Sequence, residues 1–460
     1  MSTTQQPLAA PTDFRGQLLS PADPDYDEAR ALYNAMIDRR PALIARCTDV
    51  ADVISAVDFA RTSGLPLAVR GGGHNGAGLG SVDDGLVVDL SPMRGIRFDP
   101  ATQTVRAQGG CRWGDVDHAT HAFGRATPSG VISTTGVGGL TVGGGLGYLS
   151  RAYGLTIDNL LSADVVLADG RLVRASEDEN HDLFWALRGG GGNFGVVTSF
   201  EFRTHAVDTV TAGPMLWPLE ASADILRFFD RFMAGAPEQL GGFFAFITVP
   251  PDPSFPAHLH LQKMCGMIWC FAGDPAAADE VLAEARALGP ALDGVGPVPF
   301  PAMQAAFDAL YHPGLQWYWR ADFVDELPDA AIDAHVRMAH EMPTMHSSMH
   351  LYPIDGAVHR VGPEETAFAY RASRFAQVIV GVDPDPAMAP ALRRWCVDYW
   401  DATHPYNSQG GGAYVNFLMD DGADRVRATY GPNYDRLARI KAELDPHNLF
   451  HINQNIVPSS

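Results

Sequence analysis

The sequence is poor in cysteine, in positive charge and in long apolar runs. Its five cysteines are odd in number and scattered, and none stands at zinc-ribbon spacing, so buried reduced thiols are expected. Lysine and arginine number 33 against 54 acidic residues, and the net charge of −21 argues against nucleic acid or an anionic membrane as a partner. No apolar run approaches the ~18 residues of a membrane span.

The N-terminus and the length set further limits. The first 16 residues, MSTTQQPLAAPTDFRG, lack the apolar core and the cleavage site of a signal peptide. Residues 1–20 are expected to form a loose polar arm, and the protein is predicted to be cytoplasmic. A chain of 460 residues has room for two to three domains.

The motifs of several enzyme classes are missing as well. His340 and Glu341 are followed by a histidine only at His346, which is not the H-E-x-x-H spacing of a zinc protease, and no catalytic metal is predicted. The sequence contains no G-x-S-x-G elbow, so a serine hydrolase has no support. It also lacks G-x-x-x-x-G-K-[ST], which excludes the nucleoside-triphosphate P-loop.

Glycine, by contrast, is abundant and clustered. Three glycine clusters fall between Leu65 and Arg203, each beside an apolar, β-branched run. Because glycine has no Cβ, a ligand can come close to its backbone N–H groups. Three such loops within one domain indicate a large, extended and anionic ligand.

Two of these clusters match G-x-G-x-x-G, at Gly71–Gly76 and at Gly190–Gly195. The dinucleotide fold requires a strand before the glycines and a helix after them. The first match leads into a second loop and another strand. The second follows a predicted helix, 182–188, and opens onto a predicted strand, 196–202. A nicotinamide dehydrogenase therefore remains only an alternative.

Five segments, in order along nearly the whole chain, carry a more specific resemblance. They are Arg70–His74 (R-G-G-G-H), Val137–Arg151, Tyr153–Asn159, Asp182–Gly195, and Tyr414–Phe417 followed by Asp445–Ile456. Together they resemble the FAD-binding domain of the p-cresol methylhydroxylase type and, more narrowly, the berberine bridge enzyme-like FAD-linked oxidases.

This resemblance implies a two-domain α+β fold of the p-cresol methylhydroxylase/vanillyl-alcohol oxidase type. Residues 1–205 would form the FAD-binding domain, 206–404 a substrate-binding domain, and 405–460 a C-terminal segment packing back on the first domain. After residue 205 the glycine loops give way to strands and amphipathic helices, which favours an antiparallel sheet backed by helices.

The sequence also predicts the secondary structure of four short segments. The sequence pattern predicts a helix over 25–37, one helix over 275–289, a strand over 366–373, and a strand around 413–417.

His74 is the residue to which the resemblance gives the most specific role. In the family, the histidine at this position bonds covalently to the 8α-methyl carbon of the flavin. Some members add a second bond from a cysteine in a C-P-T-V-G-x-G-G-H segment. Ile132 stands at that cysteine position and Leu140 at that histidine position, so a single link through His74 is expected.

The resemblance assigns a wider set of residues to the cofactor, although each glycine alone could also form a tight turn. The set is Arg70, Gly71, Gly72, Gly73, His74, Asn75, Gly76, Thr135, Gly138, Gly139, Gly143, Gly144, Gly145, Gly192, Asn193, Gly195, Val196, Val197, Tyr414 and Asn416.

Tyr414 and Asn416 are also candidates for catalysis. Residues i and i+2 of a strand face the same side, so both could point toward one ligand. In several family members the tyrosine helps remove a proton from the substrate. With an ordinary pKa of ~10, a tyrosine base needs a neighbouring hydrogen-bonding or positive group. As an alternative, Tyr414 is an ordinary aromatic residue of a sheet.

The predicted substrate sheet supplies further polar candidates. His350 and Tyr352 are two apart on one strand and would give a base with a hydrogen-bonding neighbour. Tyr370, and the alternating set Gln316, Tyr318 and Arg320, could also face the flavin. Most such residues belong to a core, which is the alternative for each.

The predicted function is an FAD-dependent oxidase. A C–H next to an alcohol, an amine or an activated carbon of a small, ring-containing substrate would pass hydride to flavin N5, and O₂ would be reduced to H₂O₂. Thr135 stands in the segment that holds the family's oxygen-access residue, so a dehydrogenase with another acceptor stays open. A flavoprotein that binds a metabolite without turnover is a further alternative. A monomer or homodimer is expected.

Overall fold

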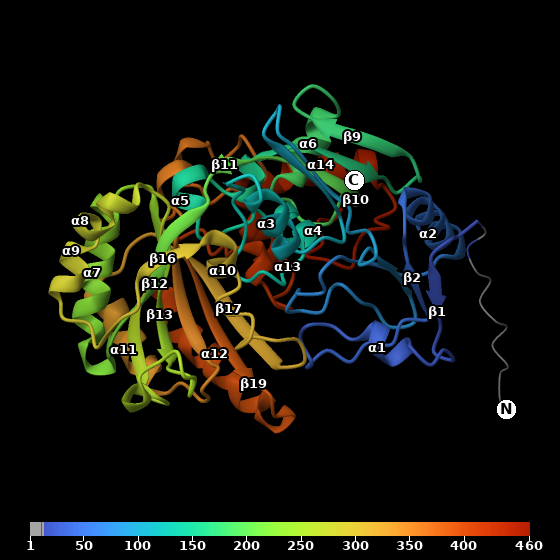
Figure 1. Cartoon of the computed structure of the whole chain (residues 1–460). Coiled ribbons are helices and arrows are strands. Elements are labelled where there is room, and N and C mark those ends of the chain that lie inside the picture. The colour runs from blue at the N-terminus through green and yellow to red at the C-terminus, as the bar shows by residue number, and fades with distance from the viewer. Residues whose placement is uncertain (1–10, 12) are drawn as a thin grey trace.

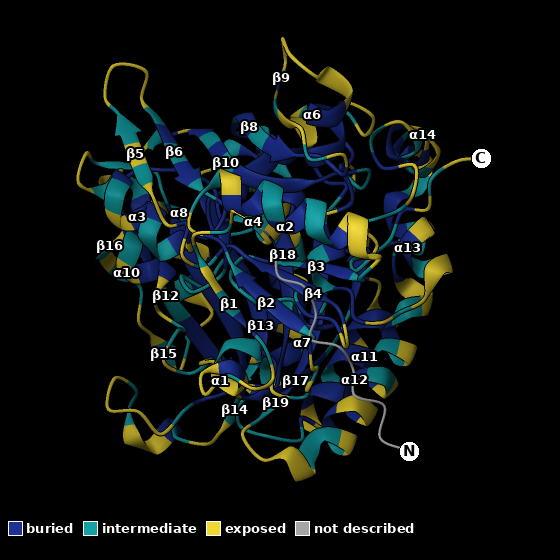
Figure 2. Cartoon of the chain, turned by 90° about the vertical axis from the view of Figure 1, so that its right-hand side faces the viewer, coloured by how far each residue is buried: buried dark blue, intermediate teal, exposed yellow. Residues whose placement is uncertain are grey.

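The computed structural model describes residues 11 and 13–460 (Figure 1). Most of the predicted N-terminal arm, including residues 1–10, lies outside the described residues, and the last part of that arm forms strand β1. Three main sheets build the molecule, and Figure 2 shows their strands buried beneath partly exposed helices and loops.

The first sheet positions the R-G-G-G-H loop. Its order is β1 (Gln17–Leu19), β2 (Leu43–Arg46), β4 (Leu86–Asp89), β3 (Leu67–Arg70). β2, β4 and β3 are parallel, and the register pairs Arg70 with Asp89 at the strand ends. Helix α2 (Val50–Ser63) is capped by the Asp49 side chain and ends at Gly64 in the left-handed region.

The second sheet is antiparallel and carries the other glycine loops. Its order is β5 (Ile96–Asp99), β6 (Thr104–Gln108), β10 (Val196–Arg203), β8 (Leu160–Val166), β9 (Leu172–Ser176). The smaller elements around it are α3 (Trp113–His121), α4 (Val137–Val142), α5 (Ser150–Tyr153), α6 (His181–Leu187), and the strand pair β7 (Arg125–Ala126) and β11 (His205–Ala206).

The third sheet has eight strands, and every pair in it is antiparallel. The order is β15 (Leu292–Asp293), β12 (Thr209–Pro218), β14 (Lys263–Phe271), β13 (Leu240–Thr248), β18 (Ser348–Pro353), β19 (Phe375–Asp383), β17 (Gln316–Val324), and β16 (Gly296–Pro299) pairs with β12. Helices α7 (Ser222–Gly235), α11 (Asp329–His340) and α12 (Ala389–Thr403) cover one face (Figure 1). The other face turns toward the glycine loops.

Alternation along β18 shows how this sheet divides two cores. Met349 and Leu351 pack into the core beneath the helices, whereas Tyr352 packs into the core on the opposite face. The strand pattern read from the sequence therefore determines which side chains can reach the glycine loops.

The C-terminal segment returns to the first part of the chain. Helix α14 (Tyr434–Leu444) packs against α6, and the guanidinium of Arg436 lies 4.0 Å from the ring centroid of Trp185. Helix α13 (Ala423–Tyr430) precedes it, and α10 (Phe300–Gln304) packs against α3.

All four local expectations need correction. The first helix is only α1 (Tyr26–Arg30), and the helix over 275–289 is broken into α8 (Ala278–Val281) and α9 (Ala283–Ala287). Residues 366–373 form no strand, because Arg371 turns inward to bond Asp158 and Thr366. Around 413–417 the chain forms a 3₁₀ turn, Val415–Phe417, instead of a strand.

Candidate cofactor and substrate cavity

A cavity of about 380 Å³ lies between the glycine loops and the open face of the eight-stranded sheet. One end is walled by backbone from the loops after β3, around residue 136 and around residue 191. The other end is walled by aromatic side chains of β13, β17 and β18. A ligand in this cavity would touch bare main chain at one end and ring faces at the other.

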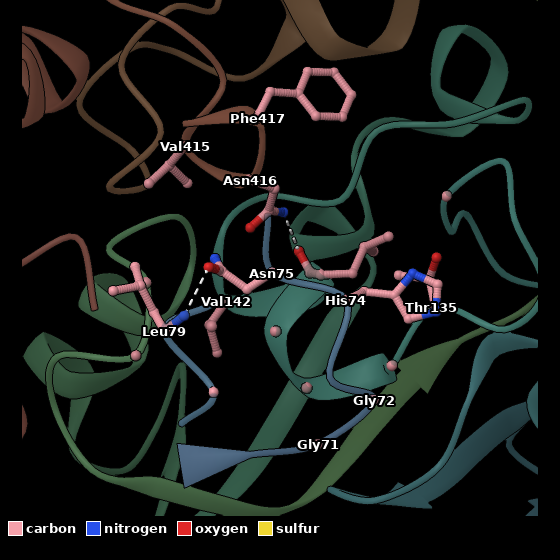
Figure 3. A pocket seen from close by; sticks show the side chains of 18 of the residues that line it. Gly71, Gly72, His74, Asn75, Leu79, Thr135, Val142, Val415, Asn416 and Phe417 are labelled. Carbon is pink, nitrogen blue, oxygen red and sulfur yellow. Dashed lines mark hydrogen bonds between the residues drawn. The ribbon is translucent and has the colours of Figure 1, made fainter. Parts of the chain in front are cut away.

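Most of the predicted cofactor residues line this cavity. They are Arg70, Gly71, Gly72, Gly73, His74, Asn75, Thr135, Gly138, Gly139, Gly192, Gly195, Val197, Tyr414 and Asn416. Figure 3 shows the stretch from Gly71 to Asn75 following the end of β3 into the cavity. The sequence segments therefore meet in space, although they come from distant parts of the chain.

Six of the predicted cofactor residues do not line the cavity: Gly76, Gly143, Gly144, Gly145, Asn193 and Val196. A Cβ on Gly143 would lie 2.1 Å from Oδ1 of Asn416, and one on Gly76 would lie 2.2 Å from the indole of Trp319. These glycines make room for side chains of the protein, not for a ligand. Val196 is core.

Asn193 fastens the C-terminal tail. Its Nδ2 donates to the carbonyls of Gly190 and Gln454, and its Oδ1 accepts from the backbone N–H of Ile456 at 2.9 Å. This buried amide thus shapes the cavity wall indirectly, by holding the tail residues that line it.

His74 presents its imidazole to the cavity from a tightly built loop. Gly73, at φ 72°, is in the left-handed region, which glycine adopts readily. A Cβ on Gly72 would lie 2.5 Å from the backbone nitrogen of Gly136, so these two loops touch through main chain alone. Burial, together with the charge of Arg112, lowers the pKa of His74 to about 3. The imidazole is therefore neutral at physiological pH.

Arg70 holds a positive charge at the same end of the cavity. Its Nη2 donates to Oδ2 of Asp89 at 2.8 Å, while Nη1 is buried without a hydrogen-bond partner among the described residues. A buried guanidinium nitrogen left unpaired beside a cavity is suited to an acceptor on a ligand, such as an anionic oxygen.

Tyr414 and Asn416 come together even though the predicted strand is absent. The Tyr414 oxygen accepts hydrogen bonds from the N–H of Gly145 at 2.9 Å, the N–H of Leu146 at 3.2 Å and Nδ2 of Asn416 at 2.7 Å. Asn416 Nδ2 also donates to the carbonyl of Leu140 (Figure 3). Burial raises the pKa of Tyr414 to about 12, and these three donors oppose that rise.

His350 and Tyr352 form the pair expected from their spacing. His350 Nδ1 lies 2.8 Å from the Tyr352 hydroxyl, and both residues line the cavity. Burial lowers the pKa of His350 to about 3 and raises the pKa of Tyr352. Both groups are therefore uncharged at neutral pH.

The remaining sheet candidates lie elsewhere. Tyr370 is outside the cavity: it stacks on Phe323 and its hydroxyl donates to the carbonyl of Ala428 at 2.8 Å. In β17 the opposite set of residues faces the cavity, namely Trp317 and Trp319. The predicted set Gln316, Tyr318 and Arg320 is turned away, with Tyr318 in the core beneath the helices.

Sequence reasoning also missed several residues that line the cavity. They are Tyr33, Phe243, Phe307, Tyr311, Trp317, Trp319, Asn453 and Gln454. Trp317 and Trp319 are two residues apart in β17, so alternation places them on the same face. The sequence does not show that this face is the one turned to the cavity. Tyr33 had none, because it lies in an irregular segment far from every motif.

Two absences hold for the part of the chain that the structure describes. Within residues 11 and 13–460, no group of three or more histidine, cysteine or acidic side chains is placed to hold a metal ion. No helix there is both long enough and apolar enough to cross a bilayer. All five cysteines are buried free thiols, as predicted.

Comparison with known proteins gives two family matches. Residues 41–176 match the family described as FAD binding domain, and residues 413–457 match the family described as berberine and berberine like. The first match covers most strands of the first two sheets, without β1 and β10, and the second lies in the C-terminal segment.

Similar proteins cover nearly the whole chain. An FAD-linked oxidoreductase of Dictyostelium discoideum is 30% identical over 93% of this chain and 91% of its own. The (R)-6-hydroxynicotine oxidase of Paenarthrobacter nicotinovorans is 30% identical over 98% of each chain. A solved xylooligosaccharide oxidase from Myceliophthora thermophila, in complex with xylobiose, is 26% identical, covers 97% of this chain and 98% of its own, and has a TM-score of 0.84.

These matches agree with the sequence-based expectation of a two-domain α+β flavoprotein fold with an antiparallel sheet backed by helices. The chain belongs to the berberine bridge enzyme-like family of FAD-linked oxidoreductases.

Proposed function

We propose that this protein is an oxidase that binds FAD covalently through His74 alone and oxidises a small, ring-containing organic substrate. The observation that carries the proposal is one continuous cavity that joins the glycine loops, His74 and the aromatic face of the sheet. A neutral imidazole in that cavity has a lone pair for bonding to an electrophilic carbon.

The lining of the cavity supports a single link. Ile132 lines the cavity at the position where doubly linked relatives carry cysteine, and Leu140 lines it at the position of their histidine. Among the described residues, no cysteine lines the cavity, and Cys111 is buried away from it. With no cysteine there, we assign the attachment to His74, which lies on the glycine loop, and not to His350 on the sheet.

The residues present fit FAD. The unpaired Nη1 of Arg70 and the bare main chain around Gly72 and Gly136 suit an extended anionic group. Gly191 and Gly192 line the same end and present main chain there. His74 and these groups would hold the cofactor.

Bound FAD would supply a two-electron acceptor for hydride from a substrate C–H and would return the electrons to O₂ as H₂O₂. The chain's own part is orientation, exclusion of water and control of the proton. We propose that Tyr414 accepts the proton that leaves the substrate. Three N–H groups donate to its oxygen and would stabilise the negative charge of the ionised phenol. His350 with Tyr352 is the other candidate.

We further propose domain boundaries near residues 205 and 404. β11 (His205–Ala206) is the last strand to pair with the first part of the chain, and β12 begins the substrate sheet at Thr209. Residues 405–460 would complete the FAD domain through α14 and the tail.

The test is acid precipitation of purified protein. We expect a yellow pellet that keeps flavin fluorescence on a denaturing gel, and we expect His74→Ala to release its flavin into the supernatant. A wild-type protein that loses all flavin, or a His74→Ala variant that keeps it, contradicts the covalent link.

Reoxidation of the substrate-reduced enzyme by air, compared with reoxidation by an artificial dye, separates an oxidase from a dehydrogenase. Failure of every substrate class to bleach the flavin anaerobically would favour the metabolite-binding alternative.

A further inference from the structure

We propose that the substrate is an uncharged, flat ring compound carrying a hydroxyl group, and that this hydroxyl docks on the pair formed by His350 and Tyr352. The inference rests on the proposed function, because it places the substrate at the sheet end of the cavity and the flavin at the glycine-loop end.

The lining of the cavity carries very little charge. Among the described residues, the only aspartate, glutamate, lysine or arginine that lines the cavity is Arg70. It is at the glycine-loop end and is already paired with Asp89. The sheet end therefore offers no counter-charge to a carboxylate or an ammonium group. Burying an unpaired charge is costly, so a neutral ligand is favoured there.

Three of the polar side chains at the sheet end lie along a single strand. Ser348, His350 and Tyr352 alternate along β18 and all line the cavity. Their neighbours on β19 are apolar: Ser348 pairs with Val380 and His350 with Val378, and both valines also line the cavity. A ligand would thus meet a polar stripe on β18 with apolar residues of β19 beside it, and the indole N–H groups of Trp317 and Trp319 add only donors to the aromatic wall.

The hydrogen-bonding capacity of the pair matches a hydroxyl. His350 Nδ1 and the Tyr352 hydroxyl share one hydrogen bond of 2.8 Å. If tyrosine donates, the pair presents the imidazole Nε2–H and a phenol oxygen; if histidine donates, it presents the Nε2 lone pair and the phenol O–H. Either tautomer offers one donor and one acceptor, which a hydroxyl satisfies. A carboxylate needs donors only, and an ammonium group needs acceptors only.

The walls favour a ring over a sugar chain. Phe243, Phe307, Tyr311, Trp317, Trp319 and Phe417 present ring surfaces to the cavity. Phe243 lies 4.8 Å from the His350 ring and 4.9 Å from the Tyr352 ring, centroid to centroid, so the polar pair itself is framed by an aromatic face. An oligosaccharide would bury many hydroxyls against this wall with few partners.

The test compares probes with one ring system and different charge: 1-naphthylmethanol, 1-naphthoate and 1-naphthylmethylammonium, with xylobiose as the saccharide probe. Binding to the intact protein is followed by the change in flavin absorbance under anaerobic conditions and by quenching of tryptophan fluorescence. We expect 1-naphthylmethanol to bind at least about tenfold more tightly than either ion or xylobiose.

Two variants test the hydroxyl contact. Tyr352→Phe and His350→Phe should each weaken 1-naphthylmethanol about tenfold, to the affinity of 1-methylnaphthalene, because one hydrogen-bonding partner is lost. Tyr370→Phe removes the same phenol oxygen outside the cavity and should leave the affinity unchanged.

The outcomes also separate this inference from the proposed function. A yellow, acid-stable flavoprotein that binds 1-naphthoate, 1-naphthylmethylammonium or xylobiose as tightly as the alcohol overturns the substrate class and leaves the oxidase standing. If neither Tyr352→Phe nor His350→Phe changes the affinity for 1-naphthylmethanol, the docking of the hydroxyl is also overturned and the oxidase stands. A protein without bound flavin overturns the oxidase, and tryptophan fluorescence still ranks the probes.

Discussion

The imidazole of His74 lies flat against the phenol ring of Tyr33, with ring centroids 3.9 Å apart and planes inclined by 20°. Tyr33 is itself fixed at several points. Its backbone N–H donates to the carbonyl of Gly73, its carbonyl accepts from the N–H of Gly314, and its hydroxyl donates to the carbonyl of Tyr311. The orientation of the His74 imidazole is thus supported by a residue outside every recognised motif.

Replacing Tyr33 by leucine should reduce covalent attachment. The stacked face that orients the imidazole would be gone, while His74 itself is intact, so we expect a smaller acid-stable share of the bound flavin, measured by absorbance of the pellet. Tyr33→Phe keeps the ring and is the matched control. Equal acid-stable flavin in all three proteins would show that the stacking has no part in attachment.

The buried ammonium of Lys441 should be a major source of stability for the C-terminal tail. Its Nζ donates to Asp445 at 2.6 Å and to the carbonyls of Asn193 and Phe450 at 2.7 and 3.0 Å. Lys441→Met leaves the buried Asp445 carboxylate without its counter-charge, with only the backbone N–H groups of Leu449 and Phe450 donating to it, and should lower the free energy of unfolding by ~3–5 kcal/mol. Urea denaturation of the holoprotein measures this loss.

Two further variants separate the effect of charge from the effect of packing at the Lys441–Asp445 pair. Lys441→Met combined with Asp445→Asn removes both charges and should be less damaging than the single change. Arg427→Met breaks an exposed pair with Asp435 and should cost no more than ~1 kcal/mol. A Lys441→Met protein as stable as Arg427→Met would contradict a structural role for the buried pair.

Much of the fold follows from local patterns. The cap at Asp49, the left-handed Gly64 and the apolar, aromatic and β-branched composition of β13, β14 and β19 are local properties, so they can be predicted from the sequence. The R-G-G-G-H loop was found in the same way. Local patterns do not contain the side of a strand that helices will cover, and in β17 the predicted set of Gln316, Tyr318 and Arg320 is turned away from the cavity.

The errors in the site have a related cause. A glycine that admits a ligand and a glycine that admits a side chain look alike in the sequence. Gly143 faces Asn416, whereas Gly139 lines the cavity, and a Cβ added to Gly139 would meet no neighbouring atom within 4 Å. Tyr370 was placed by strand spacing, but its segment is a loop that packs on Phe323. Only tertiary contacts decide these cases.

His335, far from the cavity, should make stability depend on pH. Burial lowers the pKa of His335 to about 3, whereas the unfolded chain has the ordinary value of ~6.5. The unfolded state therefore binds the proton first as pH falls, and stability is lost between pH 6.5 and 3. His335→Phe should reduce the slope of unfolding free energy against pH in this range by up to ~1.4 kcal/mol per unit.

The control for that slope is His340→Gln, an exposed histidine on the same helix, α11. Urea midpoints between pH 4.5 and 7.5 give the comparison. The assignment to His335 is wrong if both variants keep the wild-type slope.

Tyr414 gives the clearest prediction for turnover. If its oxygen takes the substrate proton, only the ionised phenol is active, and with a pKa of about 12 the ionised fraction rises tenfold per pH unit below that value. The rate constant for reduction of the flavin by substrate should therefore increase with pH from 7 to 10, and Tyr414→Phe should lower it by ~10²–10⁴ and abolish the rise. Asn416→Ala removes one donor to the same oxygen and should shift the rise to higher pH without abolishing it. Stopped-flow reduction of the flavin under anaerobic conditions measures each profile.

If Tyr414→Phe keeps the wild-type pH profile, Tyr414 is not the base, and the pair of His350 and Tyr352 becomes the candidate. Tyr352→Phe is then the deciding variant.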